Sequence, residues 1–182
     1  MSIARVERRL ARAAQEVAPS PLLRWAAVAA ILVPDPDVLL LVRRAERSGD
    51  PWSGQMALPG GRQDPDEDLL FTAIRETAEE VGVVLPPESL LGVLDDVAPR
   101  TPVLPPIAVR PFVFRLRQRP PLHASAEIAA SSWVPLEVLV AAENRAMVEV
   151  ESRAGRLRVP AYRLAEGTVW GMTERIVSDL LG

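Results

Sequence analysis

Apolar residues along the chain occur in short runs that proline, glycine and acidic residues separate, which indicates strands alternating with helices. The runs at 25–33 and 38–43 predict two strands, and the PDPD sequence at 34–37 predicts a turn that joins them as a hairpin. Further strands are expected near 90–95, 107–116, 127–134, 147–151 and 157–159, the last two around a turn at 154–155, and helices are expected at 134–144 and 168–181. This mixed order predicts an α/β or α+β fold with one sheet between helices.

The first 17 residues have an arginine-rich helical pattern that is compatible with two interpretations. A transit peptide would be rich in arginine and serine and poor in acidic residues, whereas this segment contains Glu7 and Glu16 and little serine. We therefore expect an N-terminal helix and connector (1–22) packed on a single domain (23–182). No apolar run reaches the roughly 18 residues that a membrane-spanning helix needs, so a cytoplasmic protein without a membrane partner is expected.

Composition narrows the possible chemistry of the 182-residue chain. Cysteine is absent, His123 is the single histidine, and every basic residue is an arginine, which excludes thiolate metal sites, cysteine nucleophiles and lysine Schiff bases. Any bound metal must be held mainly by oxygen atoms, which favours Mg²⁺ or Mn²⁺. A net charge of −3 argues against nucleic acid as a partner, although local arginines could hold a phosphorylated small molecule. Whether the protein forms a homodimer stays open.

The stretch 60–83 carries the clearest local signals. A helix is predicted over about 65–81, with Asp64 as N-cap, Pro65 at the first position, Glu67 completing a capping box and Gly82 just past the end. Its apolar face is expected to consist of Leu70, Ala73, Ile74, Thr77 and Val81.

The spacing of Glu76, Glu79 and Glu80 in this predicted helix brings three carboxylates to one flank. Like charges at this spacing destabilise a helix, and a divalent cation would relieve the repulsion. The alternative is a solvated acidic face without a ligand. The glycine pair before the helix and Arg75 beside the acids favour the metal site.

This segment resembles the Nudix box, G-x5-E-x7-R-E-U-x-E-E-x-G-U, in which U is aliphatic. Thr77 is the single departure, and its methyl group can still pack. The fixed positions and the last aliphatic one are occupied by Gly61, Glu67, Arg75, Glu76, Glu79, Glu80, Gly82 and Val83. The resemblance implies the Nudix fold, a mixed sheet sandwiched between helices, and hydrolysis of a nucleoside diphosphate linked to another moiety with Mg²⁺ or Mn²⁺.

The same resemblance implies roles for individual residues. Glu76, Glu79 and Glu80 are expected to be metal ligands, with the carbonyl of Gly60 as a further ligand. Glu79 and Glu76 are the candidate catalytic residues, and Glu79 is the first choice for the base, although the base differs across the family. Glu127 is the candidate acid from outside the box; its alternative is an exposed loop glutamate. The remaining box positions are expected to be structural, with an ion pair between loop and helix: Gly61, Glu67, Arg75 and Gly82.

A second resemblance, to the coenzyme A pyrophosphatases within this family, extends beyond the box. Residues 54–61 are similar to G-x3-F-P-G-G with Leu58 for the phenylalanine, 40–45 to L-L-T-x-R-[SA], and 169–176 to W-G-x-T-x-R-I. The subgroup has a second arginine where this chain has Asp50, and Arg47 is the nearest substitute.

The two resemblances together imply a pyrophosphohydrolase of coenzyme A or acyl-coenzyme A. The departures at Asp50 and Leu58 keep other substrates open, namely NADH, ADP-ribose or another nucleotide, and a non-catalytic ligand-binding module is a further alternative. The candidate substrate-binding residues are Arg44, Arg47, Trp52 and Arg62.

Overall fold

Two apolar strands, β1 (Arg24–Val33) and β6 (Ile107–Arg115), form the centre of the molecule and run parallel, with Arg24 opposite Ile107 and Leu32 opposite Arg115. The computed structural model describes residues 2–10, 14–17, 23–50, 52–99, 106–152 and 155–182. The strands of the central sheet lie in the order β3-β2-β1-β6-β5, and β4 and β7 pair with β1 and β2. Their bounds are β2 Val38–Arg44, β3 Met56–Ala57, β4 Gly60–Arg62, β5 Leu90–Val93 and β7 Ile128–Pro135.

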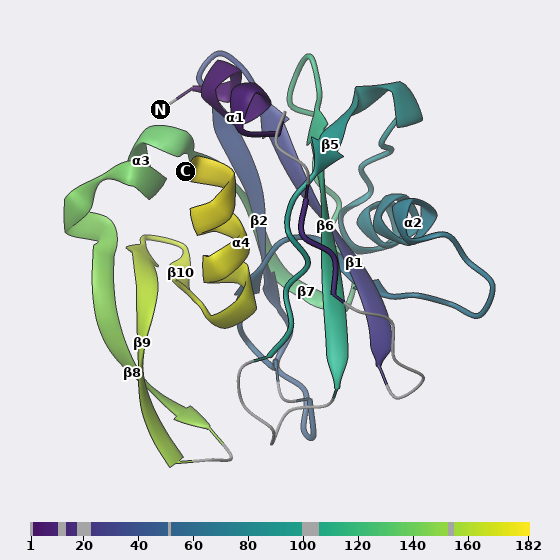
Figure 1. The fold of residues 1–182 in the computed structure, drawn as a ribbon. Coiled ribbons are helices and arrows are strands. Elements are labelled where there is room, and N and C mark those ends of the chain that lie inside the picture. Colours follow the sequence, from purple (N-terminus) through teal and green to yellow (C-terminus); the bar gives the residue numbers. More distant parts are fainter. Residues whose placement is uncertain (1, 11–13, 18–22, 51, 100–105, 153–154) are drawn as a thin grey trace.

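Helices cover both faces of this sheet (Figure 1). One face packs against α2 (Leu69–Val81), and the other packs against α1 (Ile3–Leu10) and α4 (Gly171–Leu181). The alternation along β1 creates these two faces, because Ala27, Ala29 and Ile31 join the α2 side while Ala30 and Leu32 join the other. The mixed sheet between helices confirms the predicted fold class.

A separate antiparallel sheet of β8 (Arg145–Ser152), β9 (Gly155–Leu164) and β10 (Gly167–Trp170) stands beside α4 (Figure 1). The expected strands at 147–151 and 157–159 are present but longer, and residue 154 of the expected turn lies outside the described residues. The prediction of a helix from 168 is wrong for its first residues, since Thr168 to Trp170 pair with β9 and α4 begins at Gly171. The expected helix at 134–144 is divided into α3 (Leu136–Val140) and the 3₁₀ turn η2 (Ala142–Asn144), and a further 3₁₀ turn, η1, covers Pro87–Ser89.

The start of α2 differs from the prediction. Asp68, not Asp64, is the N-cap, and its Oδ1 accepts a hydrogen bond from the backbone N–H of Leu70 at 2.7 Å. Asp66 has a φ of 63°, a left-handed conformation that excludes it from a right-handed helix. The prediction of a helix from 65 is therefore wrong, whereas its end is confirmed: Gly82 has a φ of 71° and its N–H donates to the Ala78 carbonyl.

The N-terminal helix is also shorter than its arginine-rich pattern predicts. It ends at Leu10, residues 11–13 lie outside the described residues, and 14–17 are not helical. The backbone N–H groups of Gln15 and Val17 donate to the carboxylates of Asp95 and Asp96 at 2.8 and 3.0 Å, which ties this segment to the residues that follow β5. Among the described residues, no helix combines the length and the apolarity that crossing a lipid bilayer requires.

Candidate functional site

The glycine pair at the start of β4 brings the backbone against the glutamates of α2. The N–H of Gly60 donates to Oε2 of Glu80 at 2.9 Å. A Cβ atom on Gly60 would lie 2.2 Å from the carbonyl oxygen of Ala27, and one on Gly61 would lie 2.3 Å from Cδ of Glu76. Only glycine permits this approach, so the two positions fix how close the Glu76 and Glu80 carboxylates come to the strand.

Arg75 holds the loop before α2 to the helix. Its Nε and Nη2 donate to the two carboxylate oxygens of Glu67 at 2.8 and 2.9 Å, so the expected loop–helix ion pair is present. Its Nη1 donates to Glu76 at 2.9 Å and to Glu79 at 3.3 Å. The Arg75 guanidinium lowers the pKa of Glu67 to about 2. Arg75 is therefore a common partner of Glu67, Glu76 and Glu79, and Oδ2 of Asp64 lies 3.7 Å from its Nη2.

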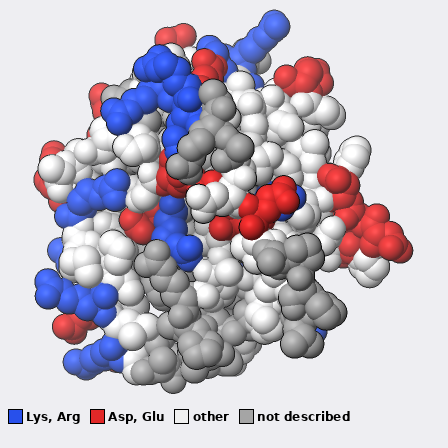
Figure 2. Space-filling view, viewed as in Figure 1, with Lys and Arg blue, Asp and Glu red and all other residues white. Residues whose placement is uncertain are grey.

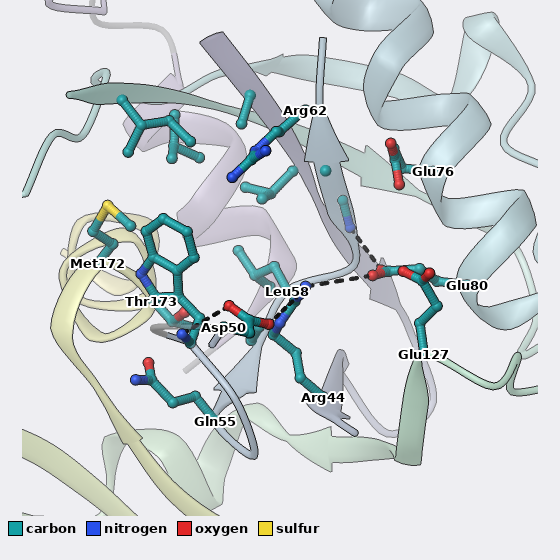
Figure 3. A pocket seen from close by; sticks show the side chains of 18 of the residues that line it. Arg44, Asp50, Gln55, Leu58, Arg62, Glu76, Glu80, Glu127, Met172 and Thr173 are labelled. Carbon is teal, nitrogen blue, oxygen red and sulfur yellow. Dashed lines mark hydrogen bonds and ion pairs between the residues drawn. The ribbon is translucent and has the colours of Figure 1, made fainter. Parts of the chain in front are cut away.

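A cavity of about 560 Å³ opens beside this helix and contains most of the predicted site residues. In Figure 3, Glu76, Glu80 and Glu127 lie at one end, with Arg44, Arg62 and Asp50 nearer its middle. The predicted substrate-binding residues all line the cavity: Arg44, Arg47, Trp52 and Arg62. The acids of the loop before α2, Asp64, Asp66 and Asp68, are exposed and do not line the cavity. Figure 2 shows acidic side chains gathered at the right edge of the molecule, where Figure 1 places this loop.

Burial controls the ionisation of the two cavity glutamates. Glu80 is only 4% exposed, and this burial raises its pKa to about 7 despite the Gly60 N–H and the Arg44 guanidinium, whose Nη1 is 3.9 Å from Oε1 of Glu80. Burial also raises the pKa of Glu76. Glu127 contributes negative charge to both and forms an ion pair with Arg47 at 3.1 Å. The cavity thus contains carboxylates whose charge is incompletely compensated.

The oxygen atoms of these residues are the type of ligand that a hard divalent cation prefers. Within the described part of the chain, no three acidic or histidine side chains converge closely enough to form a complete metal site. Glu76 and Glu80 nevertheless present oxygen atoms to the same cavity, next to the backbone of Gly60, and a cation there would offset their raised pKa values.

Glu79 is placed differently from the other two glutamates of α2. Its side chain is 60% exposed and its nearest charged partner is Arg75, whereas Glu76 and Glu80 line the cavity. The three carboxylates that the sequence places on one flank thus diverge: Glu80 points into the protein, Glu76 lies at the cavity wall and Glu79 faces outward.

Several cavity residues were not identified from the sequence. They are apolar or neutral, and they come from β6 and from α4: Ile107, Val109, Met172, Thr173 and Ile176. The similarity of 169–176 to a subgroup pattern was the available signal, but nothing local to that segment indicates that it faces the glutamates.

Comparison with known proteins gives the family. The NUDIX domain model matches residues 23–153. The chain belongs to the Nudix family of hydrolases. The Nudix hydrolase NudL of Photorhabdus laumondii is 31% identical over 163 residues, which cover 86% of this chain and 83% of that protein. The human mitochondrial coenzyme A diphosphatase NUDT8 is 32% identical over 165 residues, covering 85% of this chain and 68% of NUDT8.

Two further matches show that a similar segment occurs in a longer protein and that a solved structure has the same fold. A protein of Schizosaccharomyces pombe is 37% identical over 131 residues, but these cover 68% of this chain and only 40% of that protein. The crystal structure of a MutT/nudix family protein from Enterococcus faecalis matches 99% of this chain and 73% of its own, with a TM-score of 0.65 and 19% identity. This likeness shows the Nudix fold.

The matched Nudix domain does not contain the whole cavity. It ends at residue 153, so β9, β10 and α4 lie beyond it, yet α4 supplies Met172, Thr173 and Ile176 to the cavity wall. The part of the chain with the box glutamates and the part that closes the cavity are therefore distinct segments.

Proposed function

We propose that the chain is a metal-dependent pyrophosphohydrolase that cleaves the diphosphate of a nucleoside diphosphate derivative, and that coenzyme A or an acyl-coenzyme A is its substrate. The observation that carries this proposal is a single cavity with carboxylates at one end (Glu76, Glu80 and Glu127) and arginines beside them (Arg44 and Arg62). Cleavage of a diphosphate needs compensation of charge on phosphoryl oxygens and an activated water, and these groups supply both.

The residues of the cavity would have different roles in this reaction. Glu80 and Glu76, with the Gly60 carbonyl and Glu127, would hold Mg²⁺ or Mn²⁺, and Glu79 would join them only if it left Arg75. When bound, such an ion neutralises phosphoryl charge and makes a coordinated water more acidic. Arg44 and Arg62 would bind diphosphate oxygens, and Trp52 would offer a ring to an adenine base.

For the base, we favour Glu76 over Glu79. Glu76 lines the cavity and its pKa is raised by burial, whereas Glu79 faces outward. In this step the oxygen of water attacks phosphorus, its proton goes to the carboxylate, and the bond between phosphorus and the bridging oxygen breaks. The leaving phosphate takes the electron pair of that bond.

The apolar part of the cavity wall supports a substrate with an apolar arm. The apolar side chains of Leu58, Ile107, Val109, Met172 and Ile176 line the cavity, and Figure 3 shows Met172 on the side away from the glutamates, so a sugar arm would find few partners for its hydroxyl groups there. A pantetheine or acyl chain suits this surface better. The similarity to the coenzyme A diphosphatase NUDT8 supports the same substrate class.

A substrate panel tests the proposal. The purified protein is incubated with Mg²⁺ or Mn²⁺ and, in separate reactions, coenzyme A, acetyl-coenzyme A, NADH, ADP-ribose and nucleoside triphosphates, and the products are identified by mass. We expect 4′-phosphopantetheine or its acyl form from the first two. A preference for NADH or ADP-ribose would refute the substrate class, and no hydrolysis of any compound would favour a ligand-binding module.

A further inference from the structure

Asp50 holds two elements of the cavity wall together. Its Oδ2 accepts a hydrogen bond from Nη2 of Arg44 at 2.9 Å, and its Oδ1 accepts one from the backbone N–H of Trp52 at 2.9 Å. Its side chain is 17% exposed. It lines the cavity, as Figure 3 shows. Burial opposes its ionisation, but the hydrogen bonds from Trp52 and Arg44 outweigh this effect and lower the pKa of Asp50, so the residue is a carboxylate at neutral pH.

This carboxylate changes how much positive charge the cavity can offer. Arg44 already has Asp50 at 2.9 Å and Glu80 at 3.9 Å, and Arg47 has Glu127 at 3.1 Å. Among the described residues, Arg62 is the arginine of the cavity wall that has no carboxylate within ion-pair distance. A bound diphosphate would occupy Arg62 and the remaining donors of Arg44. A further phosphate group on the same ligand would then have to compete with a carboxylate for Arg44 or Arg47.

The position of Asp50 next to Trp52 determines which part of a nucleotide it would meet. If an adenine stacked on the Trp52 ring with its ribose on the side of the Trp52 backbone, that ribose would lie next to Asp50, which accepts the Trp52 N–H and lines the same cavity. A carboxylate beside a ribose accepts hydrogen bonds from free hydroxyl groups, whereas a phosphate ester on that ribose is repelled and normally requires an arginine.

We propose that Asp50 is a specificity-determining residue that makes the cavity select an adenylate with free ribose hydroxyls and discriminate against one with a phosphate monoester on the ribose. This inference rests on the proposed function, because it assumes that a nucleoside diphosphate derivative binds in the cavity. It predicts that dephospho-coenzyme A is a better substrate than coenzyme A, since the two differ only in the ribose 3′-phosphate.

The experiment compares kcat/KM for dephospho-coenzyme A and coenzyme A in the wild type and in two variants. Asp50→Asn keeps the size and an oxygen acceptor but removes the charge. Glu46→Gln makes the same charge change on an exposed residue of the same loop that does not line the cavity, and serves as control. A misfolded variant would lower both rates equally, so the ratio of the two substrates is the readout.

We expect a ratio of about fivefold or more in favour of dephospho-coenzyme A in the wild type and in Glu46→Gln, because like charges in contact are strongly unfavourable. The ratio should fall toward one in Asp50→Asn, mainly through a lower KM for coenzyme A. Equal rates or a preference for coenzyme A in the wild type would overturn the inference, and so would an unchanged ratio in Asp50→Asn.

Calorimetric binding of AMP and of adenosine 3′,5′-bisphosphate to the same three proteins separates this inference from the proposed function. These ligands are the adenylate halves of the two substrates and require no turnover. If neither coenzyme is hydrolysed, the proposed function fails, and tighter binding of AMP that depends on Asp50 would still support the inference. Equal binding of the two ligands, or binding of neither, would overturn it.

Discussion

Replacing Glu67 by Gln removes the main anionic partner of Arg75 without changing the size of the side chain. Both oxygens of Glu67 accept hydrogen bonds from Arg75, and Oε2 also accepts one from the Thr72 hydroxyl at 2.7 Å. The amide can accept at one atom only and carries no charge. We therefore expect the loop before α2 to be held less firmly and the protein to be less stable.

The pKa of Glu67 sets the size of this effect. It lies at about 2 instead of 4.5, a difference that corresponds to an upper limit of roughly 3 kcal/mol. Solvent screening near the surface reduces the contribution to about 1 to 2 kcal/mol. For a domain of this length, that is a decrease in Tm of roughly 2 to 8 °C at pH 7.

The direction of the pH dependence gives a stricter test. A carboxyl group whose pKa is lowered on folding stabilises the protein fully above about pH 4.5, and this stabilisation disappears as the pH falls toward 2. The difference between wild type and Glu67→Gln should therefore be largest at pH 7 and clearly smaller at about pH 3.5.

Urea unfolding at both pH values measures this difference, with Glu88→Gln as the control. Glu88 is an exposed residue of η1 without an ion pair among the described residues, so its replacement should change stability by less than about 0.5 kcal/mol. A loss of stability that is the same at both pH values, or no loss at pH 7, would refute the role assigned to the pair of Glu67 and Arg75.

Three further predictions concern activity. Gly61→Ala should reduce kcat at least about tenfold with little change in KM, since the new methyl group would displace the Glu76 carboxylate, and steady-state kinetics would check it. Glu80→Gln should abolish most turnover and reduce the thermal stabilisation by Mg²⁺, while the apo protein stays equally stable or becomes slightly more stable because a buried carboxylate is removed. Glu79→Gln should retain more activity than Glu80→Gln, because Glu79 faces outward. Full activity of Glu80→Gln would contradict the ligand assignment. The rate should fall on the acid side as Glu80, whose pKa is about 7 without metal, becomes protonated. This acid limb should move to lower pH when Mg²⁺ is raised, because protons and metal compete for the same oxygens, and pH–rate profiles at two Mg²⁺ concentrations decide the point.

The sequence predicted those strands and helix ends that are determined by a short continuous stretch of residues. The segments that became β1, β2 and β6 are rich in apolar residues, and Gly82 ends α2 as its residue type suggests. The start of α2 was mispredicted because Asp66 adopts a left-handed conformation and Asp68 caps the helix, although Glu67 accepts a hydrogen bond from the Asp64 N–H at 3.3 Å besides pairing with Arg75. Strands β3 and β4 have two and three residues, too few to show a period, and exist because β2 and β1 offer them partners.

In the candidate site, too, the sequence predicted what neighbouring residues determine and missed what distant contacts determine. The box spacing identified Glu76 and Glu80, but not that Glu79 faces outward, because the difference depends on which side of α2 the strand β4 covers. Arg44 and Trp52 were identified as candidates, whereas Asp50 appeared only as a departure from a pattern. Its two hydrogen bonds across the loop became apparent only in three dimensions.

The contribution of α4 to the cavity has a consequence for how such an enzyme can diversify. Met172, Thr173 and Ile176 lie far from the box glutamates in the sequence and line the same cavity, and Figure 3 shows Met172 and Thr173 on the side away from those glutamates. Substitutions on this helix can therefore change the shape offered to the non-reacting arm of a ligand while the carboxylates keep their geometry. Descendants of one ancestral sequence could in this way acquire new substrates through their last helix, without passing through an inactive intermediate.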